Sequence, residues 1–438
     1  MKGGAPMKRA AAVFLFAAVG VGLAGVATAS RADADTPLVI RGGRVVPVSG
    51  PAIENGAVLV VGGKIKAVGP ADAIAVPAGA EVVDAAGRWV LPGFVEGLAS
   101  IGLGDGYEIA EGDETSDPVA AGLRLLDAVD PFDKRFAHVA GAGVTTLMIA
   151  PGRSNVIGAR TVVVKPRGAT AEAMVLLEPA GLKLTLGEGP KAAFGAKGRL
   201  PGTRMGSAYV VRKALLDASE YARKRRDQAA AAAAAAKKGK GGAALPAPPR
   251  SLDLEPLADL LDGKLTAFVE CHRADDIQTA LRLVDEFHFR AVLLGATEGS
   301  KCAGEIAKRG LPVVVTVMGI GSKRVETKNA GLGNAAALVA AGIKTAIAAE
   351  DALGIGAQEE LPLSAALAAK GGLDRAAALR AVTLTAAEVL GVAGRVGSLE
   401  PGKDADIVIL DGDPFDYRTR VVRVFIDGQT VRVPEPLR

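Results

Sequence analysis

Apolar and polar positions follow two different patterns along this chain. Near its start, short β-branched stretches crowd together between Gly and Pro residues, which is typical of strands joined by tight turns. The predicted strands are Leu38–Ile40, Arg44–Val48, Ala57–Val61, Lys64–Val68, Glu81–Val83 and Arg88–Leu91. This part of the chain is therefore predicted to be an all-β module.

The pattern of apolar and polar positions changes after Pro92-Gly93. Apolar strand-like stretches now alternate with amphipathic or Ala-rich helical stretches, which predicts βα units and a parallel sheet. The predicted strands are Phe94–Ala99, Val144–Ile149, Ala173–Leu177, Leu265–Cys271, Ala291–Leu294, Pro312–Val317 and Lys344–Ala348. A span of about 300 residues suits an α/β fold of the (β/α)8 TIM-like barrel type.

Strand-like stretches return at the end of the chain, at Asp406–Leu410, Arg420–Ile426 and Thr430–Val433. Neither end of the chain has enough strands for an independent core, so we expect both ends to form one composite β-sandwich domain. The predicted domains are residues 30–90 and 396–438 for the two sandwich halves and residues 91–395 for the barrel.

Residues 223–249 differ in composition from the rest of the barrel. They hold a basic cluster, eight consecutive alanines at 229–236, a lysine-rich run and a Pro/Ala stretch. A basic arm for an acidic partner is one interpretation. We favour a low-complexity insertion, in which poly-Ala extends a helix that ends in a solvated linker.

The first 29 residues have the pattern of an export signal. Lys2, Lys8 and Arg9 precede an uncharged apolar run of 18 residues, and Ala27–Ala29 supplies a small-x-small cleavage site. An uncleaved anchor is the alternative, because 18 residues is near the lower limit for a membrane span. We predict a periplasmic or secreted protein that is cleaved after Ala29 and then has no stable membrane insertion.

Composition narrows the function classes. Hydrophobic residues at 49% and charged residues at 23% exclude a wholly disordered chain. A net charge of only +4 and 4% aromatic residues argue against a nucleic-acid partner. Two cysteines exclude a disulfide-stapled scaffold, and three histidines limit the number of imidazole ligands that a metal site could use.

Short motifs between about Leu38 and Val433 form a recognisable series. They are Leu38–Arg44, Gly63–Gly69, Val83–Gly87, Leu91–Glu96, Gly143–Thr146, Asn155–Gly158, Ala180–Lys183, His272–Ile277 and, most specifically, Gly397–Asp406. Together they resemble the amidohydrolase superfamily, in its imidazolonepropionase-like branch. The resemblance implies a metal-dependent hydrolase of C–N bonds in cyclic or linear amides. One or two divalent ions such as Zn²⁺ would lie at the C-terminal mouth of the barrel and activate water.

The ligand positions that this resemblance implies are mostly substituted. The family has a His-x-His on its first barrel strand, a His on the fifth and sixth strands and an Asp on the eighth. The matching residues here are Leu98, Ser100, Glu270, Gly295 and Glu350 or Asp351. Leucine and glycine side chains offer no donor atom, and serine is a poor ligand for a borderline ion. We therefore expect no metal cofactor and little or no catalysis, which makes the chain a pseudoenzyme candidate.

An active hydrolase with a rearranged metal site is the alternative. His272 lies two residues beyond Glu270 on the same predicted strand, so both side chains point the same way. Together with Glu350 they form a candidate Zn²⁺ ligand set. In the other interpretation, these carboxylates are polar mouth residues paired with Arg273 or Lys183.

The remaining histidines and cysteines add no second site. His138 is expected in a helix, and His288 at the barrel end opposite the mouth. Cys271 and Cys302 are compatible with a disulfide or with two buried thiols. Cys271 and His272 are adjacent on a strand and point to opposite faces, so they do not form a nucleophilic pair. The expected partner is a small amide substrate or ligand, and the sequence leaves a homo-oligomer open.

Overall fold

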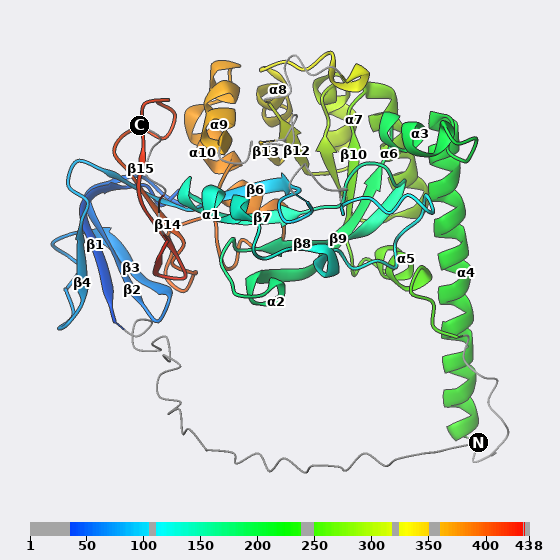
Figure 1. Ribbon diagram of the computed structural model, residues 1–438, viewed down its shortest axis with the longest axis horizontal. Helices are drawn as coiled ribbons and strands as arrows, with labels where there is room; N and C mark the ends of the chain where they lie inside the picture. Colours follow the sequence, from blue (N-terminus) through cyan, green and yellow to red (C-terminus); the bar gives the residue numbers. More distant parts are fainter. Residues whose placement is uncertain are drawn as a thin grey trace, which may run out of the picture.

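The computed structural model describes residues 36–104, 111–237, 249–317, 324–349, 360–431 and 433. Within these residues, two sheets of eight strands each organise the chain. Sheet A lies at the left of Figure 1, and sheet B with its helices fills the rest of the molecule. The predicted signal segment at 1–29 and the site candidates Glu350 and Asp351 lie outside the described residues.

Sheet A joins the two ends of the chain. Its order is β16-β15-β14-β5-β1-β2-β3, and β4 also pairs with β1. Its strands are β1 (Leu38–Val45), β2 (Ile53–Val61), β3 (Lys64–Pro70), β4 (Glu81–Asp84), β5 (Trp89–Pro92), β14 (Ile407–Leu410), β15 (Val421–Ile426) and β16 (Gln429–Val431). Figure 1 shows the early, blue strands beside the late, red ones. Residues from both ends, including Ile40, Val58, Ile407 and Phe425, share one apolar core.

The strands of sheet A are hydrogen-bonded in one continuous order, in which strands from the two chain ends form a single β domain. Its β3 edge returns to the segment before β14, because Ile65 N–H donates to the Lys403 carbonyl and Ala405 N–H to the Gly63 carbonyl, both at 2.9 Å. The two strands predicted around Gly42 are a single strand. Gly42 has φ +86° where the pairing with β2 shifts register, and such a bulge bends a strand without ending it.

Sheet B is the barrel. Its order is β13-β12-β11-β10-β9-β8-β7-β6. The strands are β6 (Phe94–Ala99), β7 (Val144–Ile149), β8 (Ile157–Val164), β9 (Val175–Thr185), β10 (Ala267–Cys271), β11 (Ala291–Gly295), β12 (Val313–Thr316) and β13 (Thr345–Ala348). The barrel is nearly closed, because the Glu96 carboxylate on β6 accepts a 3.0 Å hydrogen bond from Ala349 N–H, just after β13.

The predicted fold class is confirmed, but the expectation of a wholly parallel sheet is wrong at one strand. β8 runs antiparallel to both β7 and β9, and the other neighbouring strands are parallel. The prediction missed β8 and placed a strand at Ala173–Leu177. There the chain forms a short helix, α2 (Ala171–Met174), in which Thr170 caps the first turn, and β9 starts directly after it.

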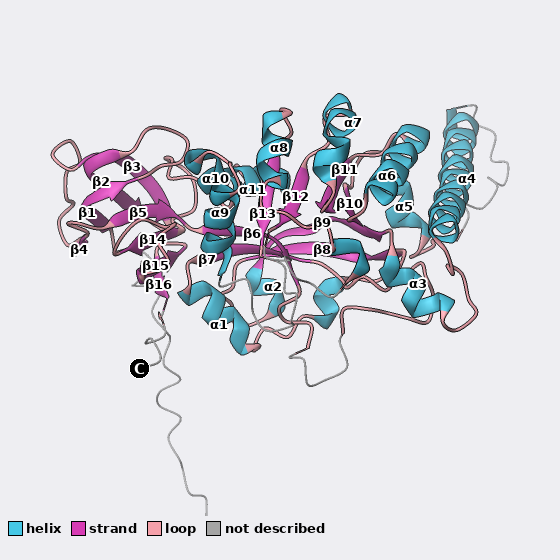
Figure 2. Ribbon diagram, turned by 90° about the horizontal axis from the view of Figure 1, so that it is seen from above, coloured by secondary structure: helices cyan, strands magenta, loops and turns pink. Residues whose placement is uncertain are grey.

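Helices surround the strands of sheet B. Figure 2 shows α1 and α2 on one side of the strands and α6, α7 and α8 on the other. The helices not yet given are α1 (Lys134–Gly141), α3 (Glu188–Gly195), α4 (Arg204–Lys237), α5 (Leu254–Leu261), α6 (Ala274–Phe287), α7 (Ala303–Lys308), α8 (Asn334–Ala340), α9 (Leu361–Lys370), α10 (Arg375–Ala381) and α11 (Leu384–Val389). The strands of the barrel are buried on both faces, by the barrel interior on one side and by the helices on the other. Strands such as β12 are therefore apolar at consecutive positions and do not alternate between apolar and polar residues.

Helix α4 contains the first part of the predicted insertion and extends far beyond the barrel in Figure 1. Its basic cluster does not form an open cationic arm, because each of the four cations has an anionic neighbour. The pairs are Arg223 with Asp227, Lys224 with Glu220, Arg225 with Glu255, and Arg226 with Asp262. In the described part of the chain, no helix is both long enough and apolar enough to cross a membrane.

A buried ion cluster fastens sheet A to the barrel. Lys165, which follows β8, donates to Asp404 at 2.8 Å, Asp406 at 3.0 Å and Asp427 at 2.5 Å. Burial raises the pKa of Asp406 to about 6, although Lys165 opposes the shift. The second oxygen of Asp406, Oδ2, is buried without a hydrogen-bond partner among the described residues. The junction therefore holds a carboxyl group that is partly protonated near neutral pH.

Candidate functional site

The polar cluster of the barrel lies at its mouth, where the parallel strands end. On β10, Phe268 belongs to the apolar cluster inside the barrel, while Val269 and Cys271 pack outward against the helices. Because side chains alternate along a strand, Glu270 points into the barrel, and His272 follows it on the same side. The two side chains meet there, with 3.3 Å between His272 Nε2 and Glu270 Oε1.

Lys183 on β9 supplies the cation at the centre of this cluster. It pairs in register with Phe268, so its side chain enters the barrel beside Glu270. Its Nζ lies 2.7 Å from Glu270 Oε2 and 3.3 Å from the carbonyl oxygens of Pro151 and Gly152. An ammonium group has three N–H donors, so these three acceptors account for all of them. Lys183 is 1% exposed and is held as part of the interior.

Electrostatics keep Glu270 ionised although it is only 5% exposed. Burial by itself would raise its pKa, but Lys183, then Arg153 and His272, together hold the pKa of this carboxyl well below its usual range. Arg153 Nε is 3.9 Å from Glu270 Oε1. The mouth thus contains one buried carboxylate with a lysine and an arginine beside it. Arg273 belongs to a different pair, since it contacts Asp275 at 2.9 Å.

His272 also contacts a hydroxyl that the sequence analysis did not single out. Its Nδ1 is 2.8 Å from Thr297 Oγ1. Its other ring nitrogen, Nε2, faces the Glu270 carboxylate and is placed to donate to it, so the imidazole bridges the carboxylate and the Thr297 hydroxyl. The short pattern Gly295-Ala296-Thr297-Glu298-Gly299 directly after a strand was the signal in the sequence that could have identified this residue.

Gly295, which matches the sixth-strand ligand position, makes room for the imidazole. A Cβ atom at this position would lie 2.5 Å from His272 Cε1, and the backbone has φ +79°. A histidine side chain at position 295 would therefore compete with His272 for the same space. The glycine and the position of His272 are mutually dependent.

The first-strand positions offer little to a metal ion. Leu98 packs against the apolar cluster inside the barrel, and Ser100 is exposed beyond the end of β6. Glu96, two residues before Leu98, accepts hydrogen bonds from the N–H groups of Leu98 and Ala349 at the barrel seam. Burial raises the pKa of Glu96 to about 8. Glu96 was absent from the predicted site, because a sequence does not show which carboxylate is sealed from water.

Among the described residues, no group of three or more His, Cys, Asp or Glu side chains could hold a metal ion. Both thiols are free and buried, and burial raises the pKa of Cys271 well above its usual range. His138 is exposed on α1. His288 ends α6 in the left-handed conformation, before β11 begins. These two histidines do not join Glu270 and His272.

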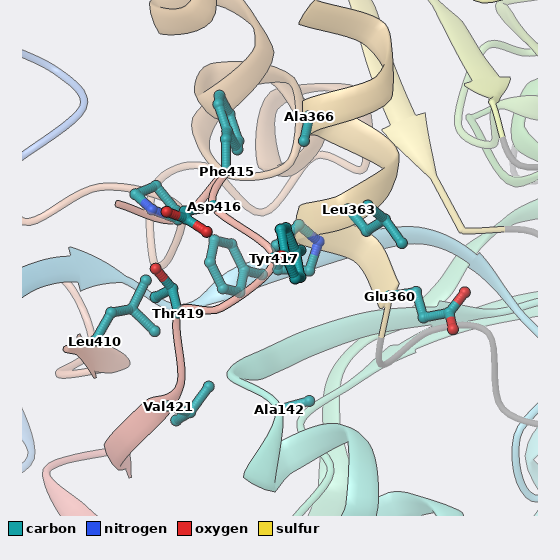
Figure 3. A pocket seen from close by; sticks show the side chains of 13 residues that line it. Ala142, Glu360, Leu363, Ala366, Leu410, Phe415, Asp416, Tyr417, Thr419 and Val421 are labelled. Atoms are coloured by element: carbon teal, nitrogen blue, oxygen red, sulfur yellow. The ribbon is translucent and has the colours of Figure 1, made fainter. Parts of the chain in front are cut away.

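A cavity lies where α9 meets the chain between β14 and β15 (Figure 3). This cavity of about 250 Å³ has an apolar lining that includes Leu363, Leu410 and Phe415, with Tyr417 89% exposed beside it. Its carboxylates are Glu360 and Asp416, and Arg418 binds Asp416 at 2.6 Å. Among the described residues, none of those that line the cavity is a histidine, cysteine or lysine, so the barrel mouth is the better candidate for chemistry.

The nearly closed barrel with an added sheet made from both chain ends is the architecture of barrel hydrolases, and the sequence profile of the amidohydrolase family matches residues 265–431. A solved amidohydrolase from Thermotoga maritima MSB8 is 34% identical, with a TM-score of 0.82. The match covers 90% of this chain and 99% of that one. The chain belongs to the amidohydrolase family.

Two curated relatives match less completely. Amidohydrolase tasK from Hapsidospora irregularis is 28% identical over 379 residues, which is 83% of this chain and 38% of that protein. This chain therefore spans about two fifths of the length of that relative. An imidazolonepropionase from Syntrophobacter fumaroxidans is 43% identical, but only over 76 residues. So short a match leaves the imidazolonepropionase-like branch a proposal.

Proposed function

We propose that this chain is an exported member of the amidohydrolase family, related to its imidazolonepropionase-like branch. Its barrel mouth binds a small amide-type ligand and performs little or no metal-dependent C–N hydrolysis. One observation carries the proposal: the Lys183 ammonium group is 2.7 Å from Glu270, inside the set of residues that would have to hold the metal. Barrel enzymes bind small molecules at this mouth, which is the reason for placing the ligand there.

The residues present do not fit the metal that the family implies. A divalent ion on Glu270 would lie close to the Lys183 ammonium, and two cations at such a distance repel each other strongly in a buried site. Both ring nitrogens of His272 already have hydrogen-bond partners, Thr297 and Glu270. The Leu98 side chain has only carbon atoms and therefore offers no metal ligand. The imidazole of His272 fills the space beside Gly295. No step of a mechanism is therefore assigned to a metal.

A rearranged Zn²⁺ site on Glu270, His272 and Glu350 would require Lys183 to leave Glu270. That movement would break the contacts of a fully engaged ammonium group and leave its charge buried, which is costly. The contacts of Lys183 therefore favour a mouth without a metal over the rearranged Zn²⁺ site. Export rests on the charged and apolar pattern of residues 1–29, so the compartment proposed is periplasmic or extracellular.

Elemental analysis of the mature protein after dialysis tests the proposal. We expect far less than one Zn²⁺ per chain and no metal-dependent turnover on a panel of cyclic and linear amides. The matched control is Lys183→Met, which removes the competing cation while keeping the length of the side chain. Near-stoichiometric metal in the unaltered protein, lost on Glu270→Ala or His272→Ala together with turnover, would refute the proposal.

A further inference from the structure

The Thr297 hydroxyl is the end of a chain of hydrogen-bonding groups. Thr297 Oγ1 lies 2.8 Å from His272 Nδ1, His272 Nε2 lies 3.3 Å from Glu270 Oε1, and Glu270 Oε2 lies 2.7 Å from Lys183 Nζ. A hydroxyl beside a histidine that is oriented by a carboxylate is the recurring arrangement of metal-independent acyl-transfer sites, which are recognised by geometry whatever their fold.

The backbone around Thr297 makes a sharp turn between a strand and a helical segment. Strand β11 ends at Gly295, the chain turns sharply, and the helical segment η2 (Gly299–Cys302) and α7 follow. Gly295 has φ +79°, and Ala296 has φ +37°, a conformation that is unfavourable for a residue with a side chain. The sequence Gly-Ala-Thr-Glu-Gly has the spacing of the Gly-x-Ser-x-Gly turn, which presents a nucleophilic hydroxyl between a strand and a helix.

The turn is held in place by the strand that carries the histidine. Ala296 N–H donates to the Cys271 carbonyl, and Glu298 N–H donates to the His272 carbonyl, both at 2.9 Å. Thr297 therefore lies between two residues that are hydrogen-bonded to the end of β10. This double attachment fixes the hydroxyl relative to the imidazole, as a general base requires of its partner.

We propose that Thr297, His272 and Glu270 form a metal-independent acyl-transfer site for small activated esters or amides. The inference rests on the proposed function, because His272 can act as a base only if no metal occupies it. Glu270 orients the ring, while Lys183 holds Glu270 in position and does not touch the substrate.

The reaction balances without an added reductant, oxidant or cofactor. Thr297 Oγ forms a bond to the acyl carbon, and its proton moves to His272 Nδ1. The bond to the leaving oxygen or nitrogen breaks, and the leaving group takes the proton from His272. Water then attacks the acyl carbon, gives one proton to His272, and the bond to Thr297 Oγ breaks as that proton returns to the threonine.

The test is acetylation of the full mature chain by p-nitrophenyl acetate in the presence of a chelator, followed by acid quench and peptide mass spectrometry. The probe is small because Thr297 is only 6% exposed. We expect an acetyl group on Thr297, its loss in Thr297→Val, and its retention in Thr297→Ser. Because a general base contributes about 10²–10⁴-fold, His272→Gln should lower the rate of acetylation at this residue at least tenfold.

Thr327→Val is the matched control, because Thr327 is also buried but its hydroxyl donates to the Arg324 carbonyl and not to a histidine. It should leave acetylation of Thr297 unchanged. A metal-free protein that shows no acetyl group on Thr297, or the same rate in His272→Gln, overturns the inference alone. Stoichiometric metal on the unaltered chain overturns the proposed function as well, so the two failures are distinguishable.

Discussion

Replacing Lys183 by methionine should destabilise the barrel strongly. The substitution keeps the length and most of the volume of the side chain but removes the ammonium group that faces Glu270 and two backbone carbonyls. Glu270 is then left in the interior without its closest cation. Removing one partner of a buried pair typically costs about 3–5 kcal/mol, so we expect a loss of this size in the free energy of unfolding near pH 8.

The effect of Glu270 on stability should depend on pH in opposite directions in the two proteins. The unaltered Glu270 has a pKa well below that of the unfolded chain, so it stabilises the fold above about pH 4.5, and this contribution is lost as the pH falls through the folded-state value. In Lys183→Met, burial is the largest effect on Glu270 and raises its pKa. The variant then loses stability as the pH rises. The difference in the free energy of unfolding between the unaltered protein and the variant should therefore increase from pH 5 to pH 8.

Urea unfolding at both pH values, followed by fluorescence and circular dichroism, measures this gap. The double variant Lys183→Met/Glu270→Gln should recover most of the loss, because a neutral amide no longer needs a counter-ion. Lys213→Met is the control, since Lys213 and Asp217 form an exposed pair on α4, and its loss should change the free energy of unfolding far less than Lys183→Met does. A loss below about 1 kcal/mol for Lys183→Met, or a gap that narrows at high pH, would refute this account of the mouth.

Three further outcomes are expected. Gly295→Ala should destabilise the fold by roughly 2–3 kcal/mol in thermal or urea unfolding, because it combines a left-handed backbone with displacement of His272. Gly310→Ala is the control, because Gly310 has φ +63° but open space around it. Its loss of stability should come only from placing an alanine in the left-handed backbone conformation. Asp406 should lower the stability of the unaltered chain by about 2 kcal/mol between pH 4 and pH 7, since its folded-state pKa lies above its unfolded value. Asp406→Asn should remove this contribution, and a pH slope that the substitution leaves unchanged would contradict this. N-terminal sequencing of exported protein should begin at Ser30, and an intact N-terminus in the membrane fraction would contradict cleavage.

The sequence predicted the parts of the fold that local pattern determines. Strands β6 and β7 have the predicted bounds, because each is an apolar run that begins after a glycine and is followed by a small residue, Ser100 or Ala150. The prediction failed at β8 and β9. There the chain reverses direction within the barrel, and the β-branched run at 157–164 could equally have been a parallel strand. Pairing direction depends on residues far away in the sequence, which local pattern does not contain.

The candidate site was only partly predictable for the same reason. Alternation along a strand was enough to place Glu270 and His272 on one face, and Lys183 was a named pairing candidate. Thr297 and Glu96 were missed, because their roles depend on which strand neighbours which and on exclusion of water. Arg273, the other named partner, binds Asp275 instead, since the chain leaves β10 and starts α6 at this residue.

The residues at the mouth depend physically on one another. Glu270 is buried in this barrel whether or not catalysis occurs, so some cation must lie beside it, and Lys183 does so with every donor engaged. His272 keeps its place because position 295 has no side chain. Histidines placed at positions 98 and 100 alone would therefore leave the lysine beside Glu270. Under the proposed function, building a metal centre here would require the removal of Lys183 as well, because one buried carboxylate does not compensate both an ammonium group and a divalent ion.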